Sequence, residues 1–261
     1  MIETTDFRKS EHYTLSIRLT ADGFCFSLFN PLVEREKAFS VEMVRADEDS
    51  SLCGNLRRVV QQTEWMSQPF GHVHVVVETI RHTLVPMDFF DEDQASVLFH
   101  HCLVQNDNEV VLFDTMPLSN SAMLYGMDES AYNYLQEVFP AARFHSKAGS
   151  LLDLFASKSR QDNTRKLFVN FGNNIATFYA YQQGLPLLCN SQAIEQAANA
   201  AYYTLLCWKE LDLDQQHDEL LLSGNIYQPQ ELLPLLQRYI QNVVVMNDAQ
   251  HIDLQNISLC E

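Results

Sequence analysis

A strand–turn–strand pattern occurs twice in this chain of 261 residues, near the start and again past the middle. In the first copy, TLSIRLT is followed by a turn at residues 22–23 and then by FCFSLFNP. In the second copy, KLFVNF is followed by a turn at 172–174, IATFYAYQ, a turn at 183–184 and LPLLCN. The turns contain Gly, Asp and Asn, which favour tight reversals of the backbone. A chain that repeats this unit is expected to fold as two related halves.

The same order of elements follows in both halves: three strands, a helix and a further strand. The spacing of apolar residues predicts the first set at residues 13–20, 23–30, 38–46, 51–67 and 72–79. The second set is predicted at 166–171, 174–182, 185–190, 192–211 and 219–224, followed by a helix at 229–241 and a strand at 243–247. Ser191 is the predicted N-cap of the long helix in the second half.

The segment at residues 81–127 has no counterpart in the second half. The remaining predictions for the first half are a helix at 88–103, a strand at 108–115, mostly loop at 117–127, a helix at 128–138, a strand at 142–146 and a helix at 149–160. The polar segment 159–166 then separates two predicted lobes, at residues 1–160 and 161–261. The predicted fold class is therefore α/β, with an insertion in the first lobe.

The charge of the chain restricts its partners. Its 17 basic and 34 acidic residues give a formal net charge of −17, which disfavours nucleic acid because that binding depends on neutralising phosphates. No apolar run approaches the roughly 20 residues that cross a bilayer, so no direct membrane insertion is expected. The starting segment MIETTDFRKSEHY lacks the apolar core of a signal peptide, and the six cysteines form no C-x-x-C pair. These features predict a cytoplasmic protein without a zinc site.

Two such halves in tandem resemble the actin-like ATPase superfamily, which includes actin, Hsp70 chaperones, sugar kinases and bacterial cell-division and pilus-assembly proteins. The segment VNFGNNIATFYAYQQGLPLLCNS has the spacing of the superfamily's second phosphate hairpin, and LLLSGN resembles its adenosine element. The whole chain is also similar to an uncharacterised bacterial family with this fold. The resemblance implies two ribonuclease-H-like lobes, each with a mixed five-stranded sheet and helices.

The positions that hold Mg²⁺ in this superfamily are changed here. The resemblance places the strand-end aspartates at Arg18 and Asn170, and a glycine of the first turn at Thr20. Mg²⁺ is usually held through carboxylates and waters, whereas an amide is a poorer ligand and a guanidinium repels the metal. Because phosphoryl transfer depends on that metal, no catalytic residue and no metal site are predicted.

A residual nucleotide site is one interpretation of the second half, with ATP as the candidate cofactor. The residues of that site would be Asn170, Gly172, Asn173, Asn174, Ser223, Gly224 and Asn225. The other interpretation is conformational, because Gly and Asn tolerate the positive φ that a hairpin loop or a strand-to-helix turn requires. The sequence leaves both interpretations open.

Two further groups of residues have alternative interpretations. Arg18 is either a counter-charge for an anion bound without metal or a strand residue that is solvated or paired with a carboxylate. His72, His74 and Glu78 would share one face of a strand. A metal site there is not expected, because no third ligand group is identifiable.

The first functional hypothesis is a non-catalytic scaffold that binds a protein partner. By analogy with the pilus-assembly proteins, a cleft or a sheet edge would capture a peptide segment. The alternative is a nucleotide-binding ATPase or switch with a rearranged phosphate site, in which Asp114 at the end of a candidate parallel strand would hold the metal. A small-molecule sensor that uses the cleft between the lobes is a third possibility, without a ligand-specific motif to support it.

Overall fold

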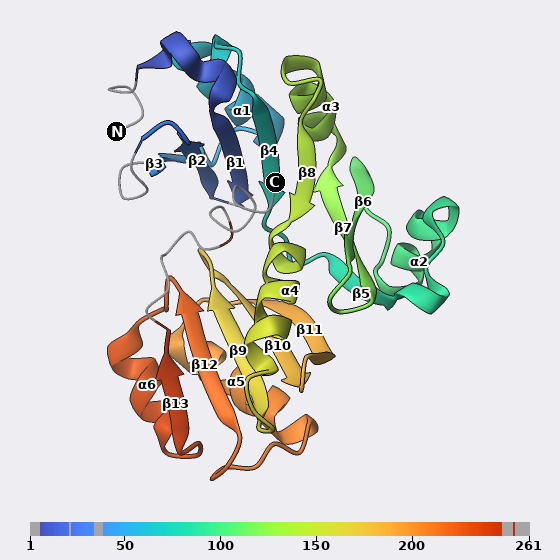
Figure 1. Cartoon of the computed structure of the whole chain (residues 1–261), viewed down its shortest axis with the longest axis vertical. Coiled ribbons are helices and arrows are strands. Elements are labelled where there is room, and N and C mark those ends of the chain that lie inside the picture. The colour runs from blue at the N-terminus through green and yellow to red at the C-terminus, as the bar shows by residue number, and fades with distance from the viewer. Residues whose placement is uncertain (1–5, 21, 34–38, 247–252, 254–261) are drawn as a thin grey trace.

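Two five-stranded mixed sheets form the body of the protein (Figure 1). The structure is a computed structural model and describes residues 6–20, 22–33, 39–246 and 253. In the view of Figure 1 one sheet lies above the other, and helix α4 (Lys147–Ser159) runs from the upper sheet down across the lower one. The mixed five-stranded sheets predicted for both halves of the sequence are confirmed.

The first sheet has the strand order β3-β2-β1-β4-β8. β2 pairs antiparallel with both β1 and β3, whereas β4 pairs parallel with both β1 and β8. Helices α1 (Leu52–Gln62) and α3 (Glu129–Val138) pack on one face. The strands are β1 (Thr14–Thr20), β2 (Gly23–Phe29), β3 (Phe39–Arg45), β4 (His72–Val77) and β8 (Arg143–Ser146).

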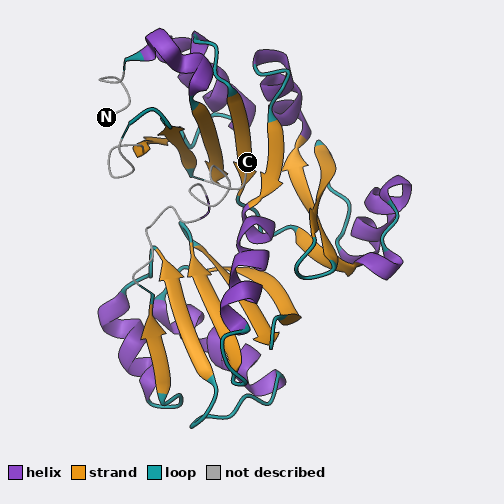
Figure 2. Cartoon of the chain, in the orientation of Figure 1, coloured by secondary structure: helices purple, strands orange, loops and turns teal. Residues whose placement is uncertain are grey.

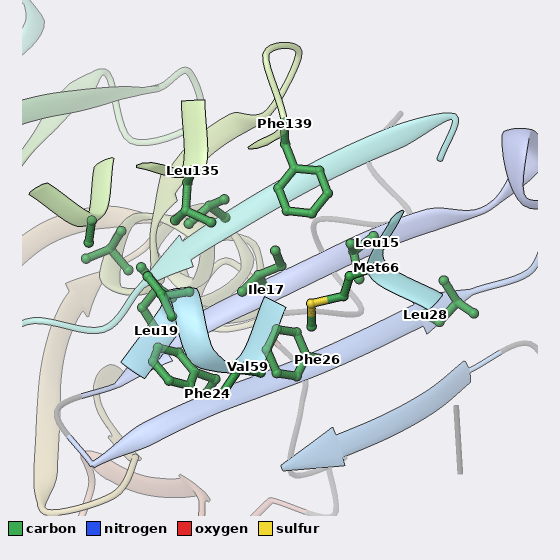
Figure 3. Packing of buried hydrophobic residues seen from close by; sticks show 14 of the residues in the cluster. Leu15, Ile17, Leu19, Phe24, Phe26, Leu28, Val59, Met66, Leu135 and Phe139 are labelled. Atoms are coloured by element: carbon green, nitrogen blue, oxygen red, sulfur yellow. The ribbon is translucent and has the colours of Figure 1, made fainter. Parts of the chain in front are cut away.

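Alternate residues of β1 and β2 build the core of the first half (Figure 3). Ile17 and Phe26 are fully buried and belong to one apolar cluster with Val59 of α1 and Leu135 of α3. Side chains alternate between the faces of a strand, so Arg18 lies on the face opposite to Ile17. The helix-covered face is therefore apolar, and the position at which the resemblance implies an aspartate belongs to the other face.

The second sheet has the strand order β11-β10-β9-β12-β13, which matches the first sheet position by position. Helices α5 (Ala197–Glu210) and α6 (Pro229–Gln237) cover one face. Helix α4 covers the other face, where the ring of Phe155 stacks on Phe168 at 4.5 Å between centroids. The strands are β9 (Arg165–Phe171), β10 (Ile175–Gln182), β11 (Leu185–Ala193), β12 (Glu219–Gly224) and β13 (Asn242–Val245).

A three-stranded antiparallel sheet stands beside the first sheet (Figure 2). Its central strand is β7 (Ser121–Asp128), with β5 (His82–Pro86) and β6 (Glu109–Met116) on either side. Helix α2 (Ala95–Cys102) packs against it through Phe99. The described part of the chain also contains the 3-10 helices η2 (Phe7–His12), η4 (Glu64–Ser67), η5 (Met87–Phe89) and η6 (Glu92–Gln94).

The insertion contains more strand than the sequence predicted. β5 was not predicted, and residues 117–127, expected to be mostly loop, contribute most of a buried central strand. The helix predicted at 88–103 was too long, since only Ala95–Cys102 is α-helical and two 3-10 turns precede it. The error at 117–127 has a physical cause: β7 is buried on both of its faces, so its sequence lacks the alternation of a half-exposed strand.

The predicted role of Ser191 as a helix cap was wrong. β11 continues to Ala193, and α5 begins only at Ala197 with Gln196 as N-cap. The Ser191 hydroxyl lies 2.7 Å from Thr177 Oγ1 of the neighbouring strand and 2.8 Å from His82 Nε2 of β5. These contacts keep the residue in the sheet, where it links the second sheet to the three-stranded one.

Candidate functional site

A cleft of about 530 Å³ lies at the carboxyl ends of the parallel strands of both large sheets. In Figure 1 the arrowheads of β1 and β4 point toward those of β9 and β12 across this region. In open α/β sheets, ligands bind beyond the carboxyl ends of the strands, and the volume lies in the range of small-molecule sites. The cleft is therefore the candidate functional site.

The structure brings the seven predicted site residues together. Six of them line the cleft, and the seventh, Ser223, is buried and hydrogen-bonded to one of the six, Asn170. They meet because β9 and β12 are parallel neighbours, so that Asn170 lies opposite Ser223 and Phe171 lies opposite Gly224. The six lining residues are Asn170, Gly172, Asn173, Asn174, Gly224 and Asn225.

The Asn170 side chain links the two neighbouring strands. It is buried, and its Nδ2 donates a hydrogen bond to the Ser223 hydroxyl at 3.0 Å. Buried polar groups generally need such a partner. The amide at the superfamily's aspartate position is thus committed to a local contact with Ser223.

Glycine is required at Gly224 for backbone reasons. Its φ is +79°, and a β-carbon there would collide with the carbonyl oxygen of Phe171. Asn174 also adopts a positive φ, of 53°, as a hairpin turn demands. At these two positions, the backbone conformation of the turns is sufficient to explain why Gly and Asn are present. This supports the interpretation that these residues shape the turns rather than bind a nucleotide.

Glycine at Gly172 makes room for an ion pair from the first half of the chain. A β-carbon there would overlap the Glu78 carboxylate and lie 2.8 Å from Lys147 Nζ. Lys147, the first residue of α4, donates to Glu78 Oε1 at 2.5 Å, and both side chains are buried. Glu78 is held at the end of β4 by its backbone N–H, which donates to the Leu19 carbonyl at 2.9 Å. The second hairpin turn is therefore packed against a paired ammonium and carboxylate.

Arg18 forms a buried ion pair with Asp253, 235 positions further along the chain. Its Nη1 lies 3.0 and 2.9 Å from the two carboxylate oxygens, and the side chains are only 9% and 2% exposed. Burial opposes the charge of Arg18, but the attraction of Asp253 and, more weakly, of Glu78 raises its pKa. Arg18 is thus paired with a carboxylate rather than solvated.

The two hairpin turns contact each other across the cleft. Asn173 Nδ2 lies 3.3 and 3.1 Å from the two carboxylate oxygens of Asp22. Asp22 also accepts a hydrogen bond from the Thr20 hydroxyl at 2.9 Å. Among the described residues that line the cleft, three basic and three acidic side chains balance in formal charge: Arg18, Arg45, Lys147, Asp22, Glu78 and Asp253.

The other candidate metal positions do not converge. His74 Nδ1 lies 3.0 Å from His145 Nε2, His72 is exposed, and Glu78 belongs to the ion pair with Lys147. In the part of the chain that the structure describes, no group of three or more His, Cys, Asp or Glu residues is placed to hold a metal ion.

The placement of Asp114 at the end of a parallel strand was wrong. Among the described residues, β6 pairs antiparallel with β7, and Asp114 lies inside β6 rather than at its end. Its Oδ2 accepts a hydrogen bond from the Ser146 backbone N–H at 2.6 Å, and it is not among the residues lining the cleft. Asp114 therefore supports the junction of β8 and α4.

Several cleft residues were not predicted as site residues. Glu78, Lys147 and Asp253 come from a strand end, a helix start and a distant position, and each contributes a buried charge. Only Glu78 had a signal in the sequence, as a polar residue after a β-branched strand. The other two depend on tertiary contacts that leave no local pattern.

The geometry places the protein in the actin-like ATPase fold class, and comparison with solved structures agrees. A protein of unknown function with an actin-like ATPase fold from Bacteroides thetaiotaomicron VPI-5482 superposes with a TM-score of 0.92. The two chains are 34% identical, over 99% of this chain and 100% of the other. The type IV pilus biogenesis complex PilM–PilN matches with a TM-score of 0.59 and 12% identity, over 90% of this chain and 88% of that one.

The chain belongs to the family described as protein of unknown function DUF3822, whose model matches residues 2–243. Comparison with curated protein sequences gave no match. Within the described part of the chain, no helix combines the length and the apolar character needed to span a membrane.

Proposed function

We propose that this protein is a non-catalytic member of the actin-like fold class that serves as a scaffold for a protein partner. Arg18 is the observation that carries the proposal. It stands where the resemblance places a metal-binding aspartate, and it is buried in an ion pair with Asp253. A guanidinium at this position repels a divalent cation and cannot coordinate it.

The carboxylates that do line the cleft are already engaged. Asp22 contacts Asn173, Glu78 is paired with Lys147, and Asp253 is paired with Arg18. To ligate Mg²⁺, Glu78 or Asp253 would have to leave a buried cation unpaired, which is strongly destabilising. Because phosphoryl transfer depends on the metal and on positioning, this arrangement supports a cleft without ATPase chemistry.

A protein of this fold that assembles with another protein supports the scaffold role. The PilM–PilN structure contains a chain of the same fold in a complex. A charge of −17 favours a partner with a basic contact surface over nucleic acid.

The absence of ATPase activity is tested by a turnover assay with purified protein and Mg·ATP. We expect phosphate release no faster than from the Asn170→Ala variant or from buffer alone. Turnover that Asn170→Ala abolishes would refute the proposal.

The scaffold role is tested by affinity purification of the tagged protein from its native host. We expect one basic protein to co-purify at constant stoichiometry. An unrelated acidic bait should not recover this protein. Failure to recover any stoichiometric partner would count against the scaffold role.

Nucleotide binding without hydrolysis is the second candidate, favoured by the six predicted residues that line one cleft. A ligand that binds only the folded state raises its melting temperature according to the ratio of ligand concentration to Kd. A titration with ATP, with and without Mg²⁺, therefore decides this candidate. An unchanged melting temperature at saturating nucleotide would exclude it.

A further inference from the structure

Two buried cations of the first half line the same cleft as the second hairpin turn. Arg18 comes from β1 and Lys147 from the start of α4, and both line the cleft. Their side chains are 9% and 10% exposed. Cys25 lines the same cleft as these two cations. The cleft therefore holds two buried cations, one of which, Arg18, stands where the resemblance places an aspartate.

Each cation is neutralised by a carboxylate of a different kind. Glu78 follows β4 directly and is anchored through its backbone to Leu19, so it is a built-in part of the first sheet. Asp253 comes from 235 positions beyond Arg18 and meets it through the two oxygens of a nearly inaccessible carboxylate. In chemical terms, this carboxylate is an anion bound to an arginine in a cleft of ligand size.

We propose that Arg18 is the centre of an anion-binding site, that the Asp253 carboxylate occupies it as an internal ligand, and that an external phosphate or carboxylate group replaces Asp253 there without a divalent cation. The inference rests on the proposed function, because it requires a cleft in which a fixed positive charge stands instead of a metal. It adds to the proposed function a class of ligand, namely a small oxyanion. It also names the Asp253 carboxylate as a group of the same chain that competes with this ligand.

The chemistry of arginine suits this role. A guanidinium carries its charge at every physiological pH and matches the oxygens of phosphate and carboxylate groups. Burial reduces solvent screening, so the attraction for an anion is stronger than at the surface. The Lys147 ammonium beside the second turn would add a second positive contact for a phosphate group.

Internal occupancy predicts weak binding in the native protein. A site that is open for only a small fraction of the time binds its ligand with an affinity reduced by that fraction. Asp253→Asn keeps the shape of the side chain and removes its charge, so it should open the site. We expect anion affinity to rise about tenfold or more in this variant, if Asp253 occupies the site at least nine-tenths of the time.

The experiment is calorimetric titration of the full chain at constant ionic strength, with inorganic phosphate and with malonate as separate probes, in EDTA and in Mg²⁺. Three proteins are compared: the native chain, Asp253→Asn, and the double variant Arg18→Gln/Asp253→Asn, which lacks both charges. We expect tighter binding by Asp253→Asn than by the native chain, equal in EDTA and Mg²⁺, and none by the double variant. The probe that binds more tightly identifies the phosphate or carboxylate source.

Three results would overturn the inference: anion binding that is equal in the single and double variants, binding that needs Mg²⁺, or no binding by a folded Asp253→Asn protein. If Asp253→Asn fails to fold in buffer, its refolding yield with either anion is measured against the double variant. Selective rescue supports the inference, and no rescue contradicts it. Mg·ATP turnover by the native chain would refute the proposed function instead, so the two failures are distinguishable.

Discussion

The two hairpins of this protein replace an expected carboxylate in different ways. In the first hairpin the position holds Arg18, whose charge is compensated by Asp253 at the far end of the sequence. In the second it holds Asn170, whose neutral amide is satisfied by Ser223 on the adjacent strand. The same place in a repeated fold can thus be stabilised by a long-range ion pair or by a local hydrogen bond. The first solution depends on distant parts of the chain, and the second does not.

Removing one charge of the first hairpin should have the largest effect. Arg18→Leu leaves Asp253 buried without its cation, and breaking a buried pair in this way costs about 3–5 kcal/mol of unfolding free energy. Asn170→Ala removes one hydrogen bond and should cost about 1 kcal/mol. Urea unfolding of both variants measures the contrast. Removing both charges with Arg18→Leu/Asp253→Asn should recover most of the loss, and equal costs for the two single variants would abolish the distinction between the hairpins.

Acid should weaken the contact between the three-stranded sheet and the second sheet, because this contact includes a neutral histidine. His82, bonded to Ser191 of β11, is buried, and this burial lowers its pKa from 6.5 to about 4. Between these values the unfolded chain binds more protons than the folded one, so stability is complete above pH 6.5 and falls as the pH drops toward 4. The interval corresponds to about 3 kcal/mol.

The measurement is urea unfolding at several pH values, with His82→Gln as the matched control. The glutamine variant should lose less stability over this interval because it has no proton to bind. Native and variant proteins with the same pH dependence would show that His82 is not the titrating group. Carboxylates that are paired in the folded state contribute mainly below this interval, so the two effects can be separated.

The smallest of the three effects is expected at the strand end beside Asn170. Gly224→Ala places a methyl group against the Phe171 carbonyl and forces alanine into a positive φ, which should cost about 1–2 kcal/mol. At Gly172 the obstacle is the end of the flexible Glu78 side chain. Alanine there should displace the Glu78–Lys147 pair without straining the backbone, and its cost should respond to salt. The result that would contradict this prediction is a loss of unfolding free energy that is independent of salt for Gly172→Ala and dependent on salt for Gly224→Ala.

Much of this fold could be predicted from the sequence because its signals are local. The turns at residues 22–23 and 172–174 and the alternation in the flanking strands are sufficient to predict both sheets. The candidate site was predictable in part for the same reason, since Asn170 and Gly224 end neighbouring parallel strands. The boundary predicted at residues 159–166 remains a proposal, and α4, assigned to the first lobe, packs against the second sheet.

The remaining features depend on contacts that have no sequence pattern. β7 is buried on both faces, so its sequence lacks the alternation of polar and apolar residues by which a half-exposed strand is predicted. Ser191 has the residue type of a helix cap, but its partners His82 and Thr177 keep it in a strand. Arg18 and Asp253 pair across 235 positions of the chain. The sequence contains many other acidic residues, and no local pattern indicates which of them pairs with Arg18.

This last pairing has a consequence for how the protein is made on the ribosome. β1 is synthesised early, yet the counter-ion of its arginine is translated only 235 positions later. Domains generally begin to fold from the N-terminal side during synthesis, so the nascent first half must fold before Arg18 can pair with Asp253. The ion pair of the first sheet can form only after residue 253 has been translated.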